Sequence, residues 1–181
     1  QFTYDTLDRL TAVTDALGHT TTFTYSPAGN ILATTNPLNH TTTYAYDDLN
    51  RLTQSTDPLG HSTQFTYDRA GNQTAVTDPL GRTVRFTYDP LNRLTQIDAP
   101  LGRLIRYAYD AVGNQTAEIH GYNNPQLTTF NYDDLNRLTT VADPLGHQTT
   151  YTYDPMGNPL TVTDPLGRAI TYTYDDLYRP I

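Results

Sequence analysis

Histidines that recur at one position of the sequence are the residues with the clearest capacity for chemistry. They are His19, His40, His61 and His147, and Arg82, Arg103 and Arg168 hold the same place elsewhere. Equivalent positions in successive hairpins of a sheet lie two strands apart, about 9.6 Å. Two nitrogens that each stand about 2.1 Å from one zinc ion cannot be that far apart. The pattern therefore favours exposed polar residues over a ladder of metal sites.

Nucleophilic catalysis has few candidate residues. Ser26, Ser55 and Ser62 are the serines, and the chain contains no Cys. His61 directly precedes Ser62, but neighbours along a strand point to opposite faces of a sheet. Because no nucleophile and base converge, we expect no catalytic residue, no cofactor and no enzymatic activity.

Adjacent acids raise the question of calcium, because carboxylates are ligands that calcium prefers. Examples are Asp47 with Asp48, and Asp133 with Asp134. These acids lack the Gly-rich nonapeptide spacing of calcium-binding solenoids, and capping of turns explains them. We therefore expect no metal site, with calcium at the turn acids as the alternative.

The composition excludes two classes of partner and favours a sheet. The chain of 181 residues has 11 basic and 19 acidic residues, a net charge of −8, and no Lys. Such a chain lacks the basic patch of a nucleic-acid binder. It has no run of about 18 apolar residues that would span a membrane. Abundant Thr and Tyr predict an all-β fold.

A tyrosine repeat positions all of these residues. Tyr4, Tyr25, Tyr46, Tyr67, Tyr88 and Tyr109 are 21 residues apart, Tyr132 follows after 23, and Tyr153 and Tyr174 after 21 each. Residues 1–181 thus form one array of eight full repeats and a partial one. Both ends match the interior of a repeat, so we expect the array to be cut from a longer chain.

Each repeat predicts one antiparallel β-hairpin. In the third repeat, residues 52–56 and 61–67 read as strands, separated by the turn Asp57-Pro58-Leu59-Gly60. Asp suits the first position of a type I turn, Pro the second, and Gly supplies a positive φ at the end. The other turn alternates between Asn-Arg, as at Asn50-Arg51, and Gly-Asn, as at Gly71-Asn72. About 17 strands of this kind predict a meander of hairpins.

Aromatic residues two apart predict a packed face, because residues two apart on a strand share a face. The set is Phe23, Tyr25, Tyr44, Tyr46, Phe65, Tyr67, Phe86, Tyr88, Tyr107, Tyr109, Phe130, Tyr132, Tyr151, Tyr153, Tyr172 and Tyr174. Thr22 and Thr24 exemplify the opposite, wetter face. Since every repeat has the rings, we favour a structural packing layer; the alternative is a platform that stacks on sugars.

The odd repeat length predicts a β-bulge. If both turns have three-residue loops, Asp57 faces His61, four residues on, and Asp47 faces Arg51. In a regular strand the first turn would then put Thr53 and Ser55 on the aromatic face, whereas the second would put Leu52 and Gln54 there. An extra residue near 53–54 of the first strand reconciles them. The bulge also places Leu94 and Ile97, three apart, on one face and adds twist, which suits a curved or spiralling strip. A two-residue loop at one turn is the alternative.

One turn is longer than the rest. His120, Gly121, Tyr122, Asn123 and Asn124, followed by Pro125, replace Asp-Pro-Leu-Gly with two additional residues. We expect a protruding loop on one edge with paired flanking strands. The loop is a candidate partner contact, and a neutral insertion is the alternative.

The motifs Tyr-Asp-x-x-Gly-Asn and Tyr-Asp-x-Leu-Asn-Arg-Leu, at 21-residue spacing with Asp-Pro-Leu-Gly between, resemble RHS or YD repeats over the whole chain. These repeats occur in bacterial Rhs toxins, BC components of Tc toxins and teneurins. The resemblance implies a hairpin strip that spirals into a hollow shell or tube. It also implies an extracellular, cell-surface or secretion-particle location.

Three functions follow as hypotheses. The first is a non-enzymatic wall segment whose partners are further repeats of the same parent chain and an enclosed toxin domain. The second is an extracellular fibre or tube in adhesion, with neighbouring copies as partners. The third is a carbohydrate-binding surface. A ring closed from about 17 strands would be only about 25 Å across, so this chain alone cannot enclose a folded domain.

Overall fold

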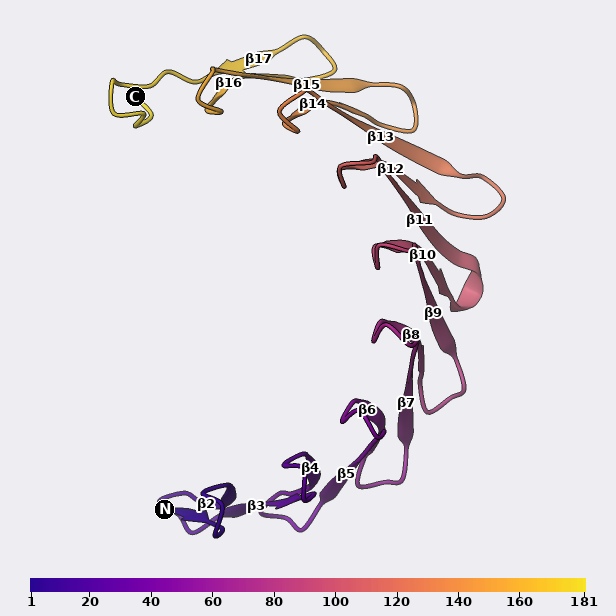
Figure 1. Cartoon of the computed structure of the whole chain (residues 1–181), viewed down its shortest axis with the longest axis vertical. Helices are drawn as coiled ribbons and strands as arrows, with labels where there is room; N and C mark the ends of the chain where they lie inside the picture. Colours follow the sequence, from indigo (N-terminus) through magenta and orange to yellow (C-terminus); the bar gives the residue numbers. More distant parts are fainter. The chain divides into compact units, whose positions relative to one another are not determined.

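The chain folds as an antiparallel meander. A computed structural model describes residues 1–181 (Figure 1). Its elements are β1 (Phe2–Tyr4), β2 (Leu10–Thr14), β3 (Thr20–Tyr25), β4 (Ile31–Thr35), β5 (Thr41–Tyr46), β6 (Leu52–Thr56), β7 (Ser62–Tyr67), β8 (Gln73–Thr77), β9 (Thr83–Tyr88), β10 (Leu94–Ala99), η1 (Pro100–Gly102), β11 (Arg103–Tyr109), β12 (Gln115–His120), β13 (Gln126–Tyr132), β14 (Leu138–Ala142), β15 (Gln148–Tyr153), β16 (Pro159–Thr163) and β17 (Ala169–Thr171). Each strand pairs with its neighbour in sequence. The predicted all-β hairpin meander of 17 strands is confirmed.

The strip divides into two compact units, Gln1–Arg85 and Phe86–Ile181. Within each unit, the turns that begin with Tyr-Asp or its variant Tyr-Ser form one edge. The turns built on Asp-Pro-Leu-Gly form the other edge (Figure 1). We call these the Tyr-Asp edge and the Asp-Pro edge. Successive turns thus alternate between the two edges.

The sheet is a single layer with almost no enclosed core. Ala75 and Leu104, 7% and 3% exposed, are the buried hydrophobic residues. Most strand residues are half-buried by their neighbours within the sheet. Contacts from one hairpin to the next must therefore supply the cohesion that a second layer supplies in most domains.

Both turns have the same geometry, as expected from their residues. At the Asp-Pro edge the Asp57 N–H donates to the carbonyl of His61 (2.9 Å), and the Gly60 N–H to that of Asp57 (3.0 Å). At the Tyr-Asp edge the Asp47 N–H donates to the carbonyl of Arg51 (3.0 Å), and the Asn50 N–H to that of Asp47 (2.9 Å). Gly60 and Asn50 hold φ values of 85° and 60°, which Gly and Asn tolerate best. The prediction of two three-residue loops is confirmed, and the two-residue alternative is wrong.

The predicted β-bulge is present. Tyr46 pairs with Leu52 and Ala45 with Gln54, so Thr53 is the extra residue. The same shift occurs in the hairpins β1–β2, β3–β4, β7–β8, β11–β12, β13–β14 and β15–β16. Without this extra residue, the two turns of a repeat would place the aromatic side chains on opposite faces of the sheet.

The bulge joins aliphatic and aromatic side chains on one face. Leu10 lies opposite Tyr4 and Val13 opposite Phe2, although Leu10 and Val13 are three residues apart. Further aromatic–valine pairs are Phe65 with Val76, Phe130 with Val141, and Tyr151 with Val162. Pairs of this kind stabilise a sheet by roughly 0.2–1 kcal/mol each. The repeated pairing extends one apolar face along each unit.

A carboxylate fixes the shape of the Asp-Pro turns. Asp57 Oδ1 accepts hydrogen bonds from the N–H groups of Leu59 and His61, both at 2.9 Å. Ala99 replaces the acid in the turn before β11 and has no such acceptor. In that turn Leu101 takes a φ of 66° next to Gly102 at 73°. The left-handed Leu101 thus marks the one turn of this type whose capping side chain is missing.

Restoring the acid should stabilise the protein. We expect Ala99→Asp to raise the free energy of unfolding by about 0.5–1 kcal/mol, the worth of one local side-chain cap. Ala99→Asn should do nearly the same, because Asn36 caps its turn through Oδ1 at 2.9 Å and 3.0 Å. Urea denaturation of both variants measures the gain. If neither variant gains stability, the capping explanation of this turn is wrong.

Candidate functional site

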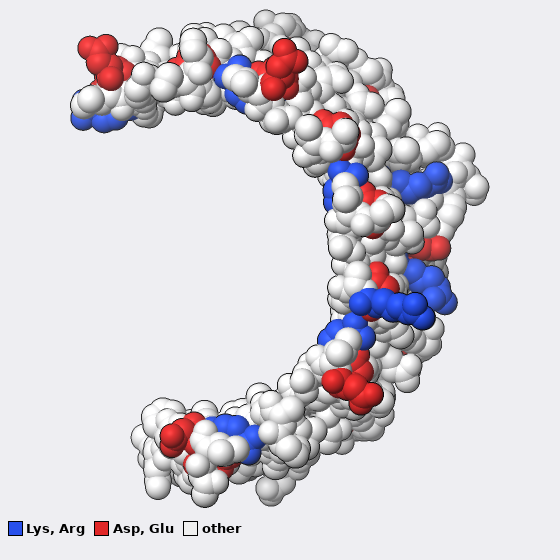
Figure 2. Space-filling view, in the orientation of Figure 1, with Lys and Arg blue, Asp and Glu red and all other residues white.

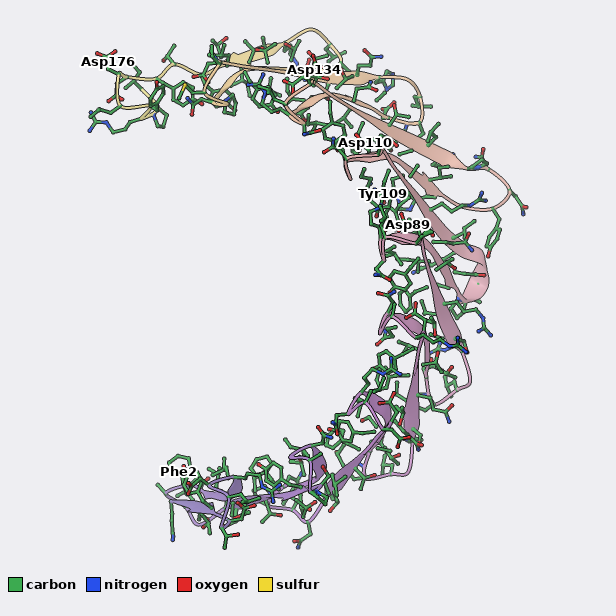
Figure 3. All side chains as sticks on the ribbon, in the orientation of Figure 1. Phe2, Asp89, Tyr109, Asp110, Asp134 and Asp176 are labelled. Atoms are coloured by element: carbon green, nitrogen blue, oxygen red, sulfur yellow. The ribbon has the colours of Figure 1, made fainter.

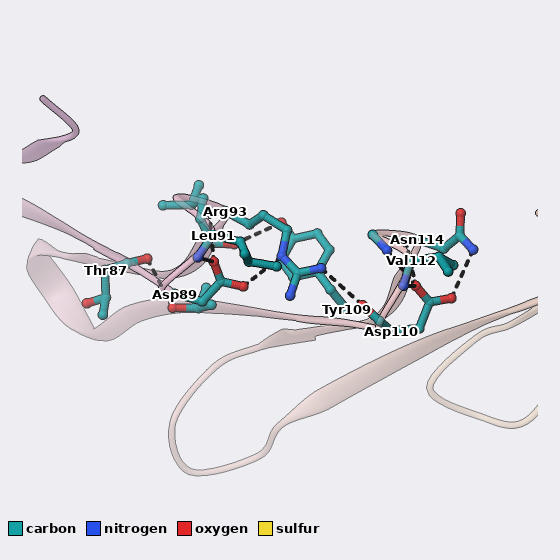
Figure 4. A network of polar contacts seen from close by, with 11 residues as sticks. Thr87, Asp89, Leu91, Arg93, Tyr109, Asp110, Val112 and Asn114 are labelled. Carbon is teal, nitrogen blue, oxygen red and sulfur yellow. Dashed lines mark hydrogen bonds and ion pairs between the residues drawn. The ribbon is translucent and has the colours of Figure 1, made fainter. Parts of the chain in front are cut away.

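An arginine in every second Tyr-Asp turn clamps two consecutive hairpins together. Arg93 Nε donates to Asp89 Oδ2 within its own turn at 2.7 Å. Arg93 Nη1 then reaches the backbone carbonyl of Asp110 in the next turn at 3.0 Å. The guanidinium carbon lies 4.7 Å from the centre of the Tyr109 ring, so the cation stacks on the ring (Figure 4). One side chain therefore ties two hairpins that backbone pairing does not join at this edge.

The repeat tyrosine completes the clamp. The backbone register between β10 and β11 begins at Gln96 with Arg106, so Leu94 lies outside the ladder. The Tyr109 hydroxyl donates to the Leu94 carbonyl at 2.8 Å. Successive hairpins thus separate toward the Tyr-Asp edge, and the tyrosine satisfies a carbonyl in the gap. This bond gives a physical reason for Tyr rather than Phe at the position.

The same network recurs with nearly constant geometry. The ring–guanidinium pairs are Tyr25 with Arg9 (4.9 Å), Tyr67 with Arg51 (4.7 Å) and Tyr153 with Arg137 (4.9 Å). Each arginine also binds the carbonyl of the next turn, at 2.9, 3.0 and 2.8 Å. The Arg51 side chain is 25% exposed, whereas Arg179, which no further hairpin follows in the structure, is 72% exposed. The neighbouring hairpin is therefore what covers the cation.

Asparagines link the alternate pairs of turns. Asn30 Nδ2 donates to Asn50 Oδ1 at 2.7 Å, and Asn114 Nδ2 to Asn136 Oδ1 at 2.9 Å. Odd turns thus reach forward through Arg, and the even turns at Asn30 and Asn114 reach forward through Asn. The 42-residue alternation was visible in the sequence, but its cause was not. The available signal was the recurrence of Arg after Asn or Asp in odd repeats only.

The turn acids serve these networks and remain ionised. The Arg51 guanidinium, which donates to Asp47, is the main cause that holds the pKa of Asp47 below its usual value; the Arg51 N–H adds to it. For Asp57 the main cause of a lowered pKa is the hydrogen bond from the His61 N–H. Figure 2 shows acidic and basic side chains side by side along the Tyr-Asp edge. These carboxylates act as caps and are poorly suited to accept a proton in catalysis.

Acid should therefore destabilise the fold. Thirteen turn aspartates have a lowered pKa: Asp5, Asp15, Asp47, Asp57, Asp68, Asp78, Asp89, Asp110, Asp133, Asp143, Asp154, Asp164 and Asp175. A folded pKa below the unfolded value of 3.8 means that the folded state binds fewer protons. Their stabilisation is complete above about pH 5 and is lost as the pH falls through the folded pKa. Melting curves followed by circular dichroism should show a constant Tm at pH 5–6 and a steep fall below about pH 4; a constant Tm down to pH 2 would contradict this role.

The histidines lie at exposed turn ends. His61 Nδ1 lies 3.0 Å from Asp57 Oδ2, and the side chain of His61 is 57% exposed. The Ser62 hydroxyl instead contacts Thr56 Oγ1 at 2.8 Å and Gln54 Nε2 at 2.9 Å. The predicted separation of His61 from Ser62 is confirmed. No cluster of three His or acidic residues that could hold a metal ion occurs in the structure.

The aromatic residues that we expect on one face are mostly half-buried. Fifteen of the sixteen rings are half-buried, and Tyr172 is 38% exposed. Thr22 and Thr24 lie exposed on the other face of β3. Figure 3 shows Tyr109 near the turn acids Asp89 and Asp110, at the Tyr-Asp edge. Tyr25, Tyr67, Tyr109 and Tyr153 are engaged through both ring and hydroxyl.

The long turn joins two paired strands, and its residues 122–125 are exposed. His120 pairs with Gln126 and Ile119 with Leu127, so the expected pairing of the flanking strands is confirmed. The hydrogen bond to Asp98 is the main cause that raises the pKa of Tyr122. The Gly121 N–H donates to the Leu104 carbonyl at 2.8 Å. Because Leu104 pairs with Asp98 on its other side, Tyr122 spans the strand that carries the buried Leu104.

This region also differs from the Asp-Pro edge of residues 1–85. The four hairpins there place two hydroxyls together, such as Thr35 with Thr41 at 2.8 Å. The corresponding pairs near the long turn are Asp98 with Leu104 and Ile119 with Leu127. Sequence reasoning located the insertion but missed the neighbouring substitutions. The apolar residues at otherwise hydroxyl positions were the available signal.

The 21-residue period agrees with a known family of repeats. The RHS Repeat family model matches residues 4–41, 25–62, 46–83, 67–104, 88–124, 132–169 and 157–181. These matches span most of the chain. This chain belongs to the RHS repeat family. The resemblance inferred from the Tyr-Asp and Asp-Pro-Leu-Gly motifs is confirmed.

Solved structures show the same RHS fold. The crystal structure of TcdB2-TccC3-Cdc42 matches with a TM-score of 0.71 at 21% identity, over 90% of this chain and 10% of that chain. A mutant Photorhabdus luminescens Tc holotoxin pore matches with a TM-score of 0.70, also at 21% identity, over 90% of this chain and 10% of that chain. The chain thus spans about a tenth of the length of these solved chains. No curated protein matches it.

Within the RHS family fold, the clamp residues act as structural groups. Their polar atoms bind other atoms of the strip, and the rings stack on cations of the same chain. No helix is long and apolar enough to cross a bilayer. The clamp residues therefore join consecutive hairpins of the sheet.

Proposed function

We propose that this chain is a wall segment of a larger RHS protein and acts as a non-enzymatic structural scaffold. The observation that carries the proposal is the clamp network. Arg93 and its equivalents join consecutive hairpins in the absence of a second layer. Charged and aromatic side chains that join each hairpin to the next would make the sheet stiff and allow it to be extended by further repeats. The match to one tenth of much longer RHS-fold chains supports a role as a segment.

The larger protein would enclose a cargo, and a toxin domain is the cargo that the family resemblance suggests. We place it outside the cell, at the cell surface or in a secretion particle. Its partners would be further repeats of the parent chain. The aromatic face serves as the packing layer of the wall, and the loop 120–124 is a secondary contact for a partner. Neither role involves a metal or cofactor.

Electron microscopy of the whole RHS protein tests the wall. We expect a closed wall around an interior that holds density, and protection of the enclosed domain from protease until the wall is denatured. An extended fibre without an interior would overturn the proposal and favour a filament.

An activity screen tests the non-enzymatic part. A panel of hydrolase substrates should show no turnover by the purified chain. The control is Ser62→Ala with His61→Ala, which should match the unmodified chain. Turnover that is lost on changing one side chain would contradict the scaffold role. Binding to a glycan array that is lost in Tyr44→Ala would favour the carbohydrate-binding hypothesis instead.

A further inference from the structure

Three asparagines of the chain stand in the pattern Asn-x-Ser/Thr, with a residue other than Pro in the middle. The three triplets are Asn39-His40-Thr41, Asn72-Gln73-Thr74 and Asn114-Gln115-Thr116. This pattern is the acceptor signal for N-linked glycans, which occupy surface positions of secreted proteins. The pattern by itself does not show whether a folded protein has room for the sugar. The structure distinguishes the three asparagines by their surroundings.

Two of the asparagines belong to the Tyr-Asp edge. Asn114 Nδ2 donates to Asp110 Oδ2 in its own turn and to Asn136 Oδ1 in the next Tyr-Asp turn, both at 2.9 Å. These bonds use both hydrogens of the amide. Asn72 Nδ2 donates to Asp68 Oδ2 at 3.0 Å, and both asparagines are half-buried. A sugar on Nδ2 replaces one hydrogen, so it would break a bond at Asn114 and would have to fit into a half-buried site at both positions.

Asn39 has the opposite surroundings. It is the exposed fourth residue of a turn at the Asp-Pro edge and has a φ of 60°. Its backbone N–H donates to the Asn36 carbonyl at 3.0 Å and closes the turn, whereas its side-chain amide has no hydrogen-bond partner. The neighbouring Leu38 is 74% exposed, and His40 is exposed as well. A sugar on Asn39 Nδ2 would therefore break no contact of the fold and would extend from the edge into solvent.

The turn does not need the Asn39 side chain. Gly18, Gly60 and Gly81 hold the equivalent place in residues 1–85, with φ values of 77–85°. A Cβ added to any of these glycines would meet no atom within 4 Å apart from its chain neighbours. Glycine is the least strained residue at a positive φ, and Asn is tolerated there. Asn39 thus adds an unused amide to a turn that closes equally well without it.

We propose that Asn39 is an acceptor for an N-linked glycan and that Asn72 and Asn114 are not. The donor is an oligosaccharide carried on a lipid diphosphate, and the enzyme is an oligosaccharyltransferase of the secretory membrane. A bond forms between Asn39 Nδ2 and the anomeric carbon of the first sugar. The bond from that carbon to the diphosphate breaks, and the lipid diphosphate leaves with the electron pair. One amide proton passes to a base of the transferase. The inference rests on the part of the proposed function that places the protein outside the cell.

The sugar is attached before the hairpin β4–β5 closes. The Thr41 hydroxyl belongs to the signal that the transferase reads. In the folded chain this hydroxyl contacts Thr35 Oγ1 at 2.8 Å, and the two residues pair in the ladder between β4 and β5. The transferase therefore acts on the unpaired chain, and folding then decides which glycans are tolerated. A glycan at Asn39 ends up at an open edge, whereas a glycan at Asn114 opposes the bond to Asn136.

Expression of the full chain behind a secretory leader in cultured eukaryotic cells tests the acceptor. The product should migrate above its 20.3 kDa, return to that position after treatment with a peptide N-glycosidase, and carry the sugar on the peptide that contains Asn39. Asn39→Gly is the most informative variant, because it removes the acceptor and installs the residue of the equivalent turns. It should lose the shift completely and keep its Tm, and Thr41→Val should lose the shift as well. The matched control is Thr74→Val with Thr116→Val, which removes the other two signals and should keep the full shift.

The outcomes separate this inference from the proposed function. The chain is collected from the medium or from the secretory compartment, and circular dichroism establishes that it is folded. A folded chain without sugar at Asn39 overturns the inference. A shift that persists in Asn39→Gly overturns it as well, because the sugar would then be on Asn72 or Asn114. Neither result bears on the scaffold function, whose failure would appear as enzymatic turnover or as a fibre. Recovery of the native protein only from inside the cell would overturn its proposed location without changing the result at Asn39, because the added leader brings the chain to the transferase.

Discussion

Deletion of Thr53 is expected to separate two hairpins while leaving each of them paired. Thr53 is the extra residue between Leu52 and Gln54. Without it, Leu52, Gln54 and Ser55 still face Tyr46, Ala45 and Tyr44, so the hairpin β5–β6 keeps its register. Relative to β7, however, Leu52 moves by one residue, about 3.3 Å. In the unmodified chain the Tyr67 hydroxyl binds the Leu52 carbonyl at 2.8 Å, and Arg51 binds the Asp68 carbonyl at 3.0 Å. A shift of that size breaks both bonds.

We expect a loss of about 3–4 kcal/mol from the free energy of unfolding, the sum of one charged and one neutral hydrogen bond with the ring contact. Urea denaturation measures the loss, and amide hydrogen exchange should locate it between β6 and β7. Deletion of Asn123 is the control, because it shortens a surface loop and should cost less than about 1 kcal/mol. Equal stability of the Thr53 deletion and the unmodified chain would show that the bulge does not align the clamps.

Arg51→Ala is the second change with a large expected effect. It removes the bond to Asp47, the bond to the Asp68 carbonyl and the stack on Tyr67. The Arg51 side chain is only 25% exposed, so water replaces these contacts poorly. We expect a loss of about 2–3 kcal/mol. Arg51→Lys should recover less than half of this, because an ammonium group cannot form the same fork of hydrogen bonds while it stacks on a ring.

The matched control is Arg82→Ala. Arg82 also bonds an acid four residues earlier, Asp78 Oδ2 at 2.6 Å, but its side chain is 61% exposed. A solvent-exposed ion pair contributes about 0–1 kcal/mol, so this variant should unfold almost as the unmodified chain does. Equal losses at Arg51 and Arg82 would mean that the ion pair within the turn, rather than the link to the next hairpin, is what stabilises the strip.

The sequence alone determined the hairpin. Asp57, Pro58 and Gly60 encode a turn whose loop length fixes which residues face each other, because turn chemistry acts over four or five neighbouring residues. Once both loop lengths were known, the odd repeat length of 21 required a bulge. The observed pairing of Tyr46 with Leu52 agrees with that requirement. The aromatic spacing then assigned the packed face, and the motifs identified the family.

Only the tertiary structure decided how one hairpin meets the next. The Arg51 bond to Asp68 spans 17 residues and the Asn30 bond to Asn50 spans 20. Such bonds depend on where the backbone ladder ends and how far the strands then separate, which no local pattern encodes. Tyr122 likewise interacts with Asp98, which lies on the far side of β11. Turn chemistry is local and can be inferred from residue types, whereas contacts between hairpins depend on angles and distances that accumulate over a whole repeat.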